Sequence, residues 1–259
     1  YIGVRNEQAA GLMAEGFARA GRRIGVCMAQ AGPGATNLLT GVASAYKGAI
    51  PMLVITGHHP LWLSEKDAFQ EMEQVELYSH VTKWSHAVPS AEKIPHALRK
   101  AFRVAFDGRP GPVHLSIPSE FLQEEIDFAP RPPERYRPIG APGPTAAQLD
   151  QALDILRNAQ APALLVGPEL VWEGGFEALA RLAESQGLPV VTTDFAHDTF
   201  PTSHPLGMGS IGREGWDCAN QVVHLESSSR DPEVSGWEFD QLQQRWSPIL
   251  AHDPYDNPN

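Results

Sequence analysis

Short apolar segments that alternate with segments of helical pattern most constrain how this chain can fold. The apolar runs are IGVCMA (24–29), PMLVITG (51–57) and GPVHLSI (111–117), each with the length of a single strand. Helical patterns occupy residues 6–20 and 34–48 between or before them. Strands that are apolar on both faces are typical of parallel sheets covered by helices, so the sequence predicts an open α/β fold with mostly parallel sheets.

The first helix has recognisable end signals, with Asn6 as a plausible N-cap and Gly21 as a plausible stop. Further along, helices are expected at 71–81 and at about 90–107. The segment TKWSHAV (82–88) between them carries no clear pattern and stays unassigned.

A proline-rich segment divides the chain. Residues 129–144, APRPPERYRPIGAPGP, hold six prolines without periodicity, which predicts a linker between a domain at 1–128 and a second α/β domain at 145–259. The second domain repeats the alternation of helices and strands. The elements expected there are a helix at 145–159, the strand PALLVG, a helix at about 173–187, and the strands LPVVTT, QVVHLES and SPILAHD.

Composition excludes several classes of protein. No apolar run approaches the ~20 residues that a membrane helix needs. The formal net charge is −11, with scattered basic residues, which argues against a nucleic-acid surface. Cys27 and Cys218 lie far apart, so reduced thiols and a cytoplasmic protein are expected rather than a disulfide or metal site. The chain starts at Tyr1 without a signal-peptide pattern and is expected to begin inside a domain.

Five motifs in order resemble thiamine-diphosphate enzymes of the acetolactate synthase type. Residues 6–57 are similar to their pyrimidine-binding domain, and DAFQE (67–71), TKW (82–84) and GRPGPVHLSIP (108–118) follow it. HPLGMGSIG (204–212) extends the resemblance into the second domain. The resemblance implies a thiamine-diphosphate pyrimidine-binding fold, expected here to lack its first strand, followed by a Rossmann-like central domain.

The resemblance gives Glu7 a catalytic and cofactor-binding role at the start of the first helix. In the family this glutamate hydrogen-bonds N1′ of the aminopyrimidine, and the imino tautomer that it favours takes the proton from C2 of the thiazolium. The resulting carbon nucleophile attacks a 2-oxo acid. This role needs a carboxyl group in a pocket closed to water. The alternative is a first-turn acidic residue that only the helix macrodipole favours.

The segment AGPGATN has features of a ligand-binding turn. Gly32 and Gly34 flank Pro33 between a strand and a helix, so the backbone can approach a flat ring, with a helix N-terminus behind it. The same pattern also fits an ordinary strand-to-helix turn. By resemblance the segment, including Asn37, lines the aminopyrimidine pocket.

His58 and His59 follow the apolar run PMLVITG, at the end of a strand where open α/β sheets place ligands. The family often has Gln at the position of His58, facing the reacting centre. A histidine there would supply a proton donor near neutral pH, which makes His58 a candidate catalytic residue. The alternative is a pair of solvent-exposed loop histidines.

Three further residues match family positions near the substrate channel. These are Phe69, Gln70 and Lys83. Their structural alternatives are a packed aromatic ring, a surface amide and a solvated lysine.

The second domain contains a literal G-x-G-x-x-G at 207–212, but FPTSHPL precedes it instead of a strand. The dinucleotide fingerprint requires a strand, a turn and a helix, so a Rossmann dehydrogenase is rejected. Ser228 stands where many family members have the arginine of a Gly-x-Arg-Phe sequence that contacts a flavin. FAD is therefore a doubtful cofactor.

The sequence contains no Gly-Asp-Gly, the motif that in the family begins the Mg²⁺ and diphosphate site of a third domain. No metal ligands are therefore assigned within this chain. It is expected to be an inactive fragment of a homodimeric or homotetrameric enzyme, whose active site forms between subunits.

The implied activity is that of a lyase or carboligase acting on a 2-oxo acid or a related carbonyl compound. Sulfoacetaldehyde acetyltransferase, oxalyl-CoA decarboxylase-like and cyclic diketone hydrolase activities stay open, as does a non-catalytic scaffold. Glu7 argues against the scaffold, because a protein without catalysis has no need of this carboxylate. The acceptor substrate is not determined, since some channel residues belong to the missing domain.

Overall fold

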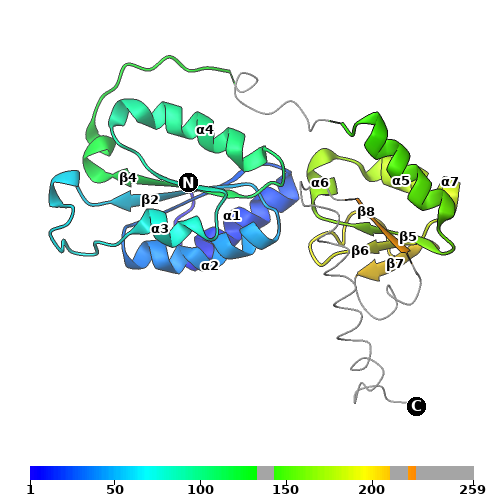
Figure 1. The fold of residues 1–259 in the computed structure, drawn as a ribbon. Coiled ribbons are helices and arrows are strands. Elements are labelled where there is room, and N and C mark those ends of the chain that lie inside the picture. Colours follow the sequence, from blue (N-terminus) through cyan, green and yellow to red (C-terminus); the bar gives the residue numbers. More distant parts are fainter. Residues whose placement is uncertain (133–142, 211–220, 226–259) are drawn as a thin grey trace, which may run out of the picture. The chain divides into compact units, whose positions relative to one another are not determined.

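The computed structural model describes residues 1–132, 143–210 and 221–225 (Figure 1). The chain divides into two compact units. The first comprises Tyr1–Gly143 with Val171–Gly175, and the second comprises Pro144–Leu170 with Phe176–Asn259. None of the described helices is both long and apolar enough to cross a membrane. Each unit is described by itself below.

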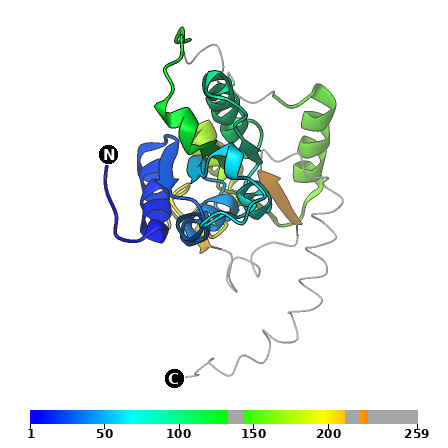
Figure 2. The same ribbon diagram turned by 90° about the vertical axis from the view of Figure 1, so that its left-hand side faces the viewer.

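A four-stranded parallel sheet in the order β1-β2-β4-β3 forms the centre of the first unit. Its strands are β1 (Gly25–Ala29), β2 (Met52–His58), β3 (Trp84–Ala87) and β4 (Pro112–Pro118). Its helices are α1 (Glu7–Gly21), α2 (Pro33–Lys47), α3 (Gln74–Ser79) and α4 (Ile94–Phe106), with 3₁₀ turns at Leu61–Leu63, Ala91–Lys93 and Ser119–Gln123. Figures 1 and 2 show α4 on one face of the sheet and α1 and α2 on the other. The expected open α/β fold is confirmed.

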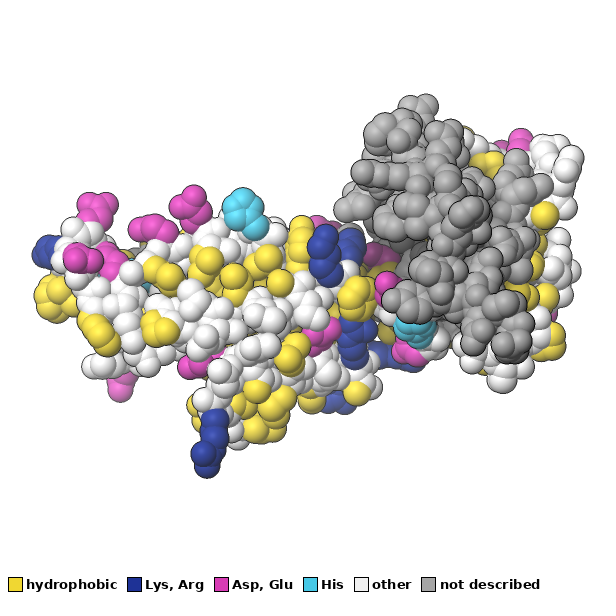
Figure 3. All heavy atoms as spheres, turned by 90° about the horizontal axis from the view of Figure 1, so that it is seen from below, with side chains coloured by type: hydrophobic (Ala, Val, Ile, Leu, Met, Phe, Trp, Pro, Cys, Tyr) yellow, Lys and Arg dark blue, Asp and Glu magenta, His cyan; other side chains and the backbone are white. Residues whose placement is uncertain are grey.

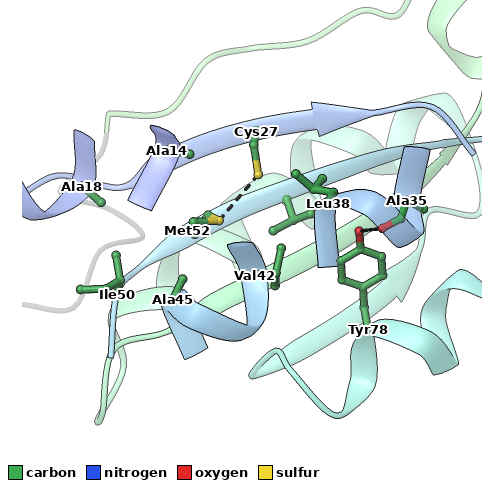
Figure 4. Close-up of a cluster of buried hydrophobic side chains, with 11 residues drawn as sticks. Ala14, Ala18, Cys27, Ala35, Leu38, Val42, Ala45, Ile50, Met52 and Tyr78 are labelled. Carbon is green, nitrogen blue, oxygen red and sulfur yellow. Dashed lines mark hydrogen bonds between the residues drawn. The ribbon is translucent and has the colours of Figure 1, made fainter. Parts of the chain in front are cut away.

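Two apolar layers hold the helices to this sheet. Under α1 and α2, the buried side chains include Cys27, Leu38, Val42 and Met52, which Figure 4 shows around the bond from the Cys27 thiol to the Met52 sulfur. Burial raises the pKa of Cys27 to about 12, so this thiol is part of the core. On the other face, three alanines of α4 pack against β4, every residue of which is buried.

A buried polar cluster joins the middle of the sheet to α2. The ring nitrogens of His114 contact the hydroxyls of Thr56 and Ser85, each at 2.8 Å, and burial lowers the pKa of His114 to about 3. The Tyr78 ring stacks on His114 at 4.0 Å, and its hydroxyl donates to the carbonyl of Ala35 in the first turn of α2 (Figure 4). Both ring nitrogens of His114 have hydrogen-bond partners within the chain, so this neutral imidazole stabilises the fold.

The second unit is also built on a parallel sheet, in the order β7-β6-β5-β8. Its core includes Leu164, Leu179, Val190 and Phe200. Its strands are β5 (Pro162–Val166), β6 (Val190–Thr192), β7 (Gly207–Ser210) and β8 (Gln221–Leu225). Its helices are α5 (Ala146–Asn158) and α7 (Phe176–Gln186), and α6 (Glu169–Glu173) lies where the two units divide.

Several elements differ from the sequence-based expectation. The unassigned segment 82–88 contains the edge strand β3, and Gly207–Ser210 of the glycine-rich motif is itself the edge strand β7. The helix expected at about 173–187 is α7 (Phe176–Gln186), and Gly174, with φ 68°, separates it from the short helix α6 (Glu169–Glu173), which was not expected. The expected strand 247–253 lies outside the described residues, as do Cys218, Ser228 and Asp253.

Candidate functional site

Glu7 and Asn37 meet where the first turns of α1 and α2 lie side by side. Asn6 caps α1 by accepting from the backbone N–H of Gln8 at 2.8 Å, as its sequence position predicts, so Glu7 is the first helical residue. The Asn37 amide donates to Oε2 of Glu7 at 3.1 Å. Oε1 has no hydrogen-bond partner among the residues that the structure describes. Glu7 is half-buried rather than enclosed, so one carboxylate oxygen is oriented and available.

Glycines set the distance between these two helices. A side-chain carbon on Gly41 would lie 2.7 Å from the backbone of Gly11, which real contacts essentially never allow. Gly11 lies one turn beyond Glu7, and Gly41 lies one turn beyond Asn37. The close backbone contact therefore brings the carboxylate and the amide within hydrogen-bond reach.

The turn between β1 and α2 runs beside the free oxygen of Glu7. Gly32 adopts φ 63°, and Pro33 opens the helix, where its missing N–H is tolerated. A side-chain carbon on Gly32 would lie 2.6 Å from Cβ of Gln70, and one on Gly34 would lie 3.5 Å from Oε1 of Glu7. The absence of both side chains leaves the face of the carboxylate open and lets Gln70 lie on the turn.

The loop between β2 and α3 is closed by a carboxylate that sequence reasoning missed. The two oxygens of Glu71 accept from the backbone N–H groups of Glu65, at 2.7 Å, and Ala68, at 2.8 Å. These bonds are the main cause that lowers the pKa of Glu71, and nearby His59 and His58 lower it further. Glu65, Asp67 and Gln70 adopt positive φ, a conformation that the sequence does not reveal.

The predicted channel residues Phe69 and Gln70 lie on this loop. The Gln30 amide donates to the side-chain oxygen of Gln70 at 3.0 Å, which joins the loop to the end of β1. Phe69 is 87% exposed, so its ring does not pack against the rest of the chain. Gln70 is brought to the Gly32 turn, whereas Phe69 extends into solvent.

The two histidines differ in their surroundings. His58 is half-buried at the end of β2, and its Nδ1 lies 2.8 Å from the carbonyl of His59. The His59 side chain is only 8% exposed, and its Nε2 lies 3.4 Å from Oε1 of Glu71. Its ring centroid is 3.9 Å from that of His58. The alternative of a solvent-exposed pair is therefore wrong, because the loop encloses His59.

The structure does not bring Lys83 to this end of the sheet. Its backbone N–H bonds the carbonyl of Pro112, where β4 begins, whereas His58 pairs with Pro118, where β4 ends. The Lys83 ammonium group donates to the carbonyls of Val104 and Asp107 at the end of α4. The pKa of Lys83 is lowered to about 8, mainly by burial; the charge of Asp107 opposes this shift and that of Arg109 adds to it. This side chain is a helix cap at the amino end of the strands.

Arg109, from the motif GRPGPV, has a similar structural task. Its guanidinium donates to the carbonyls of Tyr46 at 2.9 Å and Lys47 at 2.8 Å, the last residues of α2. Basic side chains favour helix C-termini because they satisfy terminal carbonyls and oppose the negative end of the dipole.

Comparison with known proteins identifies the family of this chain. The family model for the thiamine pyrophosphate enzyme N-terminal TPP binding domain matches residues 1–77, and the model for the central domain of the same enzymes matches residues 149–226. The chain belongs to the thiamine pyrophosphate enzyme family. Glu7, Gly32, Gly34 and Asn37 all lie within the matched TPP binding domain.

Named relatives within this family are acetolactate synthases. The large subunit of Corynebacterium glutamicum is 42% identical over 219 residues, which are 83% of this chain and 34% of that protein. The acetolactate synthase of Mycobacterium bovis is 40% identical over 230 residues, 88% of this chain and 37% of that protein. The chain thus spans little more than a third of the length of these relatives.

A solved structure supports the same family. An X-ray structure of a thiamin diphosphate-dependent enzyme from Mycobacterium smegmatis superposes with a TM-score of 0.74 at 26% identity. The match covers 85% of this chain and 44% of that one.

The residues present fit one part of thiamine diphosphate. The available oxygen of Glu7 and the open turn at Gly32 and Gly34 suit a flat ring that carries a hydrogen-bonding nitrogen. No group of three or more His, Cys, Asp or Glu side chains is placed to hold a metal ion in the described part of the chain. The fit that the described residues show is to the pyrimidine.

Proposed function

We propose that this chain is the cofactor-activating part of a thiamine-diphosphate-dependent carboligase or lyase of the acetolactate synthase type, acting on a 2-oxo acid. The observation that carries the proposal is the Glu7 carboxylate, which Asn37 orients through Oε2 while Oε1 faces the Gly32–Gly34 turn. This geometry occurs within a domain whose family binds thiamine pyrophosphate. A first-turn acidic residue favoured only by the helix dipole needs neither a dedicated amide partner nor an open glycine turn.

When bound, thiamine diphosphate supplies a carbon nucleophile and an electron sink for breaking a bond next to a carbonyl. Glu7 would share a proton with a pyrimidine ring nitrogen through Oε1. Asn37 fixes the direction of that oxygen, because its amide holds the other one at 3.1 Å. Gly32, Pro33 and Gly34 would hold the ring by close backbone approach, which a side chain on Gly34 would obstruct.

The rest of the site is proposed to come from outside this chain. Glu7 is half-buried here, and a proton shared with a ring nitrogen is favoured only where water is excluded. A second surface that covers Glu7 would provide this exclusion. We propose that a partner subunit in a cytoplasmic homo-oligomer supplies that surface, together with the acidic residues that bind Mg²⁺ and the diphosphate. FAD is not part of the proposal.

Hydrogen–deuterium exchange at C2 of the bound cofactor tests the proposal in the complete enzyme. Glu7→Gln removes the proton-sharing carboxyl group but keeps its shape, so exchange should slow strongly. Glu76→Gln is a matched control, because Glu76 is also a first-turn acidic residue and is exposed at the start of α3. Unchanged exchange in Glu7→Gln would reject the proposed role.

A further inference from the structure

Aromatic and basic side chains gather where the edge strand β3 meets α4, at the opposite edge of the first sheet from β1. The rings of Trp84 and His86 stack with their centroids 4.9 Å apart, and the Lys100 ammonium group lies 4.3 Å from the centre of the Trp84 ring. Burial lowers the pKa of His86, and the charges of Lys100 and His96 lower it further. These four side chains therefore form one cluster on the α4 side of β3.

The solvent side of α4 is basic in a chain whose formal net charge is −11. Lys93 precedes the helix, His96, Arg99, Lys100 and Arg103 lie on it, and no acidic residue occurs between Lys93 and Arg103. None of the four on the helix forms an ion pair with another residue that the structure describes. Positive charge that is concentrated and not neutralised attracts anionic partners.

The strand β3 also has backbone groups that can accept a further strand. It is the last strand in the order β1-β2-β4-β3, so β4 is its one partner among the described strands. The Val88 N–H donates to the carbonyl of Ser116 at 2.9 Å. Because N–H groups alternate between the two sides of a strand, that of the exposed Ala87 points to the open side. The segment Trp84–Ala87 has neither Lys nor Pro, the residues that commonly protect such an edge.

We propose that β3 binds an extended acidic segment of a partner protein, which adds to this edge as a further strand while its carboxylates contact the basic side of α4. Main-chain hydrogen bonds to the open side of β3 provide affinity that does not depend on sequence. The charges of Lys100, His96 and Arg103 select an acidic segment, because alternate side chains of an added strand face the α4 side of the sheet. The inference does not depend on the function proposed above.

A second copy of this chain fits the same edge less well. Two β3 strands that pair about a twofold axis would place both α4 helices on the same side of the joined sheet. Their basic side chains, Lys100 and Arg103 among them, would then repel one another across the axis. An acidic segment instead neutralises charge that has no ion-pair partner among the described residues, so charge complementarity selects it as the occupant.

Peptide binding to the complete enzyme tests the charge complementarity. The probe is a fluorescein-labelled peptide of alternating Glu and Thr, and a peptide of alternating Gln and Thr is the uncharged control. The acidic peptide should bind at least about tenfold more tightly, and its affinity should fall as salt is added, because salt screens charges at a surface. Equal affinity for the two peptides would overturn the proposal.

Substitutions on α4 test the location. Lys100→Gln and Arg103→Gln should each weaken binding of the acidic peptide at least about threefold, because each removes one positive charge beside β3. Lys47→Gln is the matched control, at an exposed lysine that ends α2, and should keep the wild-type affinity. An equal loss of affinity in Lys47→Gln would mean that the peptide is attracted to basic residues in general and would overturn the site.

Hydrogen exchange tests the strand addition without any substitution. The Ala87 amide should exchange more slowly when the acidic peptide is bound, because it then donates to the added strand. The strand β1, the other edge of the same sheet, is the control and should show no change. Unchanged exchange at Ala87, or equal protection of β1, would overturn strand addition at β3. Protection of Ala87 in the free enzyme that increases with protein concentration would identify a second copy as the occupant and would also overturn the proposal.

Discussion

The two ends of the first sheet use similar polar side chains for different purposes. At the amino end, Lys83 donates hydrogen bonds to carbonyls at the end of α4, and Arg109 donates to the last carbonyls of α2. At the carboxyl end, Asn37 holds Oε2 of Glu7 and the carbonyl of His59 lies against Nδ1 of His58, while Oε1 and Nε2 have no hydrogen-bond partner among the described residues. A side chain that is half restrained and half available suits ligand chemistry, whereas one that satisfies the backbone supports the fold.

The largest effect is expected when residues 1–259 are tested alone, without the partner surface that is proposed to complete the site at the carboxyl end of the first sheet. Residues 1–259 alone should bind thiamine diphosphate weakly, without dependence on Mg²⁺, and should release no CO₂ from pyruvate. Most binding energy of such a charged ligand comes from charge-assisted and metal-mediated contacts, and no metal-binding cluster occurs in the described residues.

Isothermal titration with and without Mg²⁺, beside a CO₂-release assay, measures this. Tight binding that depends on the metal would place the diphosphate site in this chain. Its ligands would then be sought among Asp194, Asp198 and Asp253.

The next largest effect is expected for Glu7→Gln in the complete enzyme. Turnover should fall at least about a hundredfold, equivalent to about 2.7 kcal/mol of transition-state stabilisation, because the proton-sharing carboxyl group is lost. The free energy of unfolding should change by less than about 0.5 kcal/mol, as for a partly exposed residue. Steady-state kinetics and urea unfolding of the same preparation measure both. If the variant loses stability but keeps its turnover, Glu7 stabilises the fold and does not take part in catalysis.

Lys83→Met should have the opposite result. It keeps the aliphatic stem but removes the donor to two carbonyls of α4, so the free energy of unfolding should fall by about 1–2 kcal/mol. Cofactor exchange at C2 should be unchanged. Lys93→Met, at an exposed lysine before the same helix, should change the stability little.

The stability difference for Lys83 should also depend on pH. Burial lowers its pKa to about 8, below the unfolded value of about 10.4, so the folded state binds fewer protons between these pH values. The unfolding free energy of the wild type relative to Lys83→Met should therefore rise as pH increases through this window. A difference that stays constant would mean that Lys83 titrates normally in the fold.

The smallest effect concerns the loop closed by Glu71. Because its pKa is lowered, this carboxylate stays ionised to a lower pH than an ordinary glutamate. Protection of the Glu65 and Ala68 amides from hydrogen exchange should therefore be lost only at a pH below the ordinary pKa of a glutamate, when the acceptor is protonated. The Ser64 amide is the control, because it bonds the backbone carbonyl of Leu61. If the Glu65 and Ala68 amides lose protection at the same pH as the Ser64 amide, backbone hydrogen bonds alone order the loop, and the Glu71 carboxylate does not.

The sheets could be predicted where strands are apolar and central. β2 and β4 match the expected runs to within one residue, because strands covered on both faces carry no polar residue facing solvent. β3 was missed because Trp84–Ala87 is a half-exposed edge strand, and β7 because Gly207–Ser210 has the composition of a turn. The helical pattern at 173–187 indicated α7, but the five-residue helix α6 was missed because so short a segment shows no periodicity.

The site was predictable where local rules fix geometry. The cap at Asn6 and the turn at Gly32 place Glu7 and Asn37 at the starts of two neighbouring helices. The position of the Lys83 ammonium group at the end of α4 could not be predicted, because a motif does not reveal which end of a strand a long side chain reaches. Glu71 and Gln74 were missed because their partners follow from the path of a loop with positive φ, which sequence pattern does not encode.

The contact between Gly11 and Gly41 has a consequence for how mutational surveys of this protein would be read. Neither glycine has a side chain that could contact a ligand, yet a survey scored by activity would mark both positions as intolerant. The cause would be geometric, since any added carbon lengthens the gap between two helices whose first turns carry the paired carboxylate and amide. An engineer who wants to move Glu7 by a few tenths of an ångström, without replacing it, would therefore change this helix crossing and leave the pocket untouched.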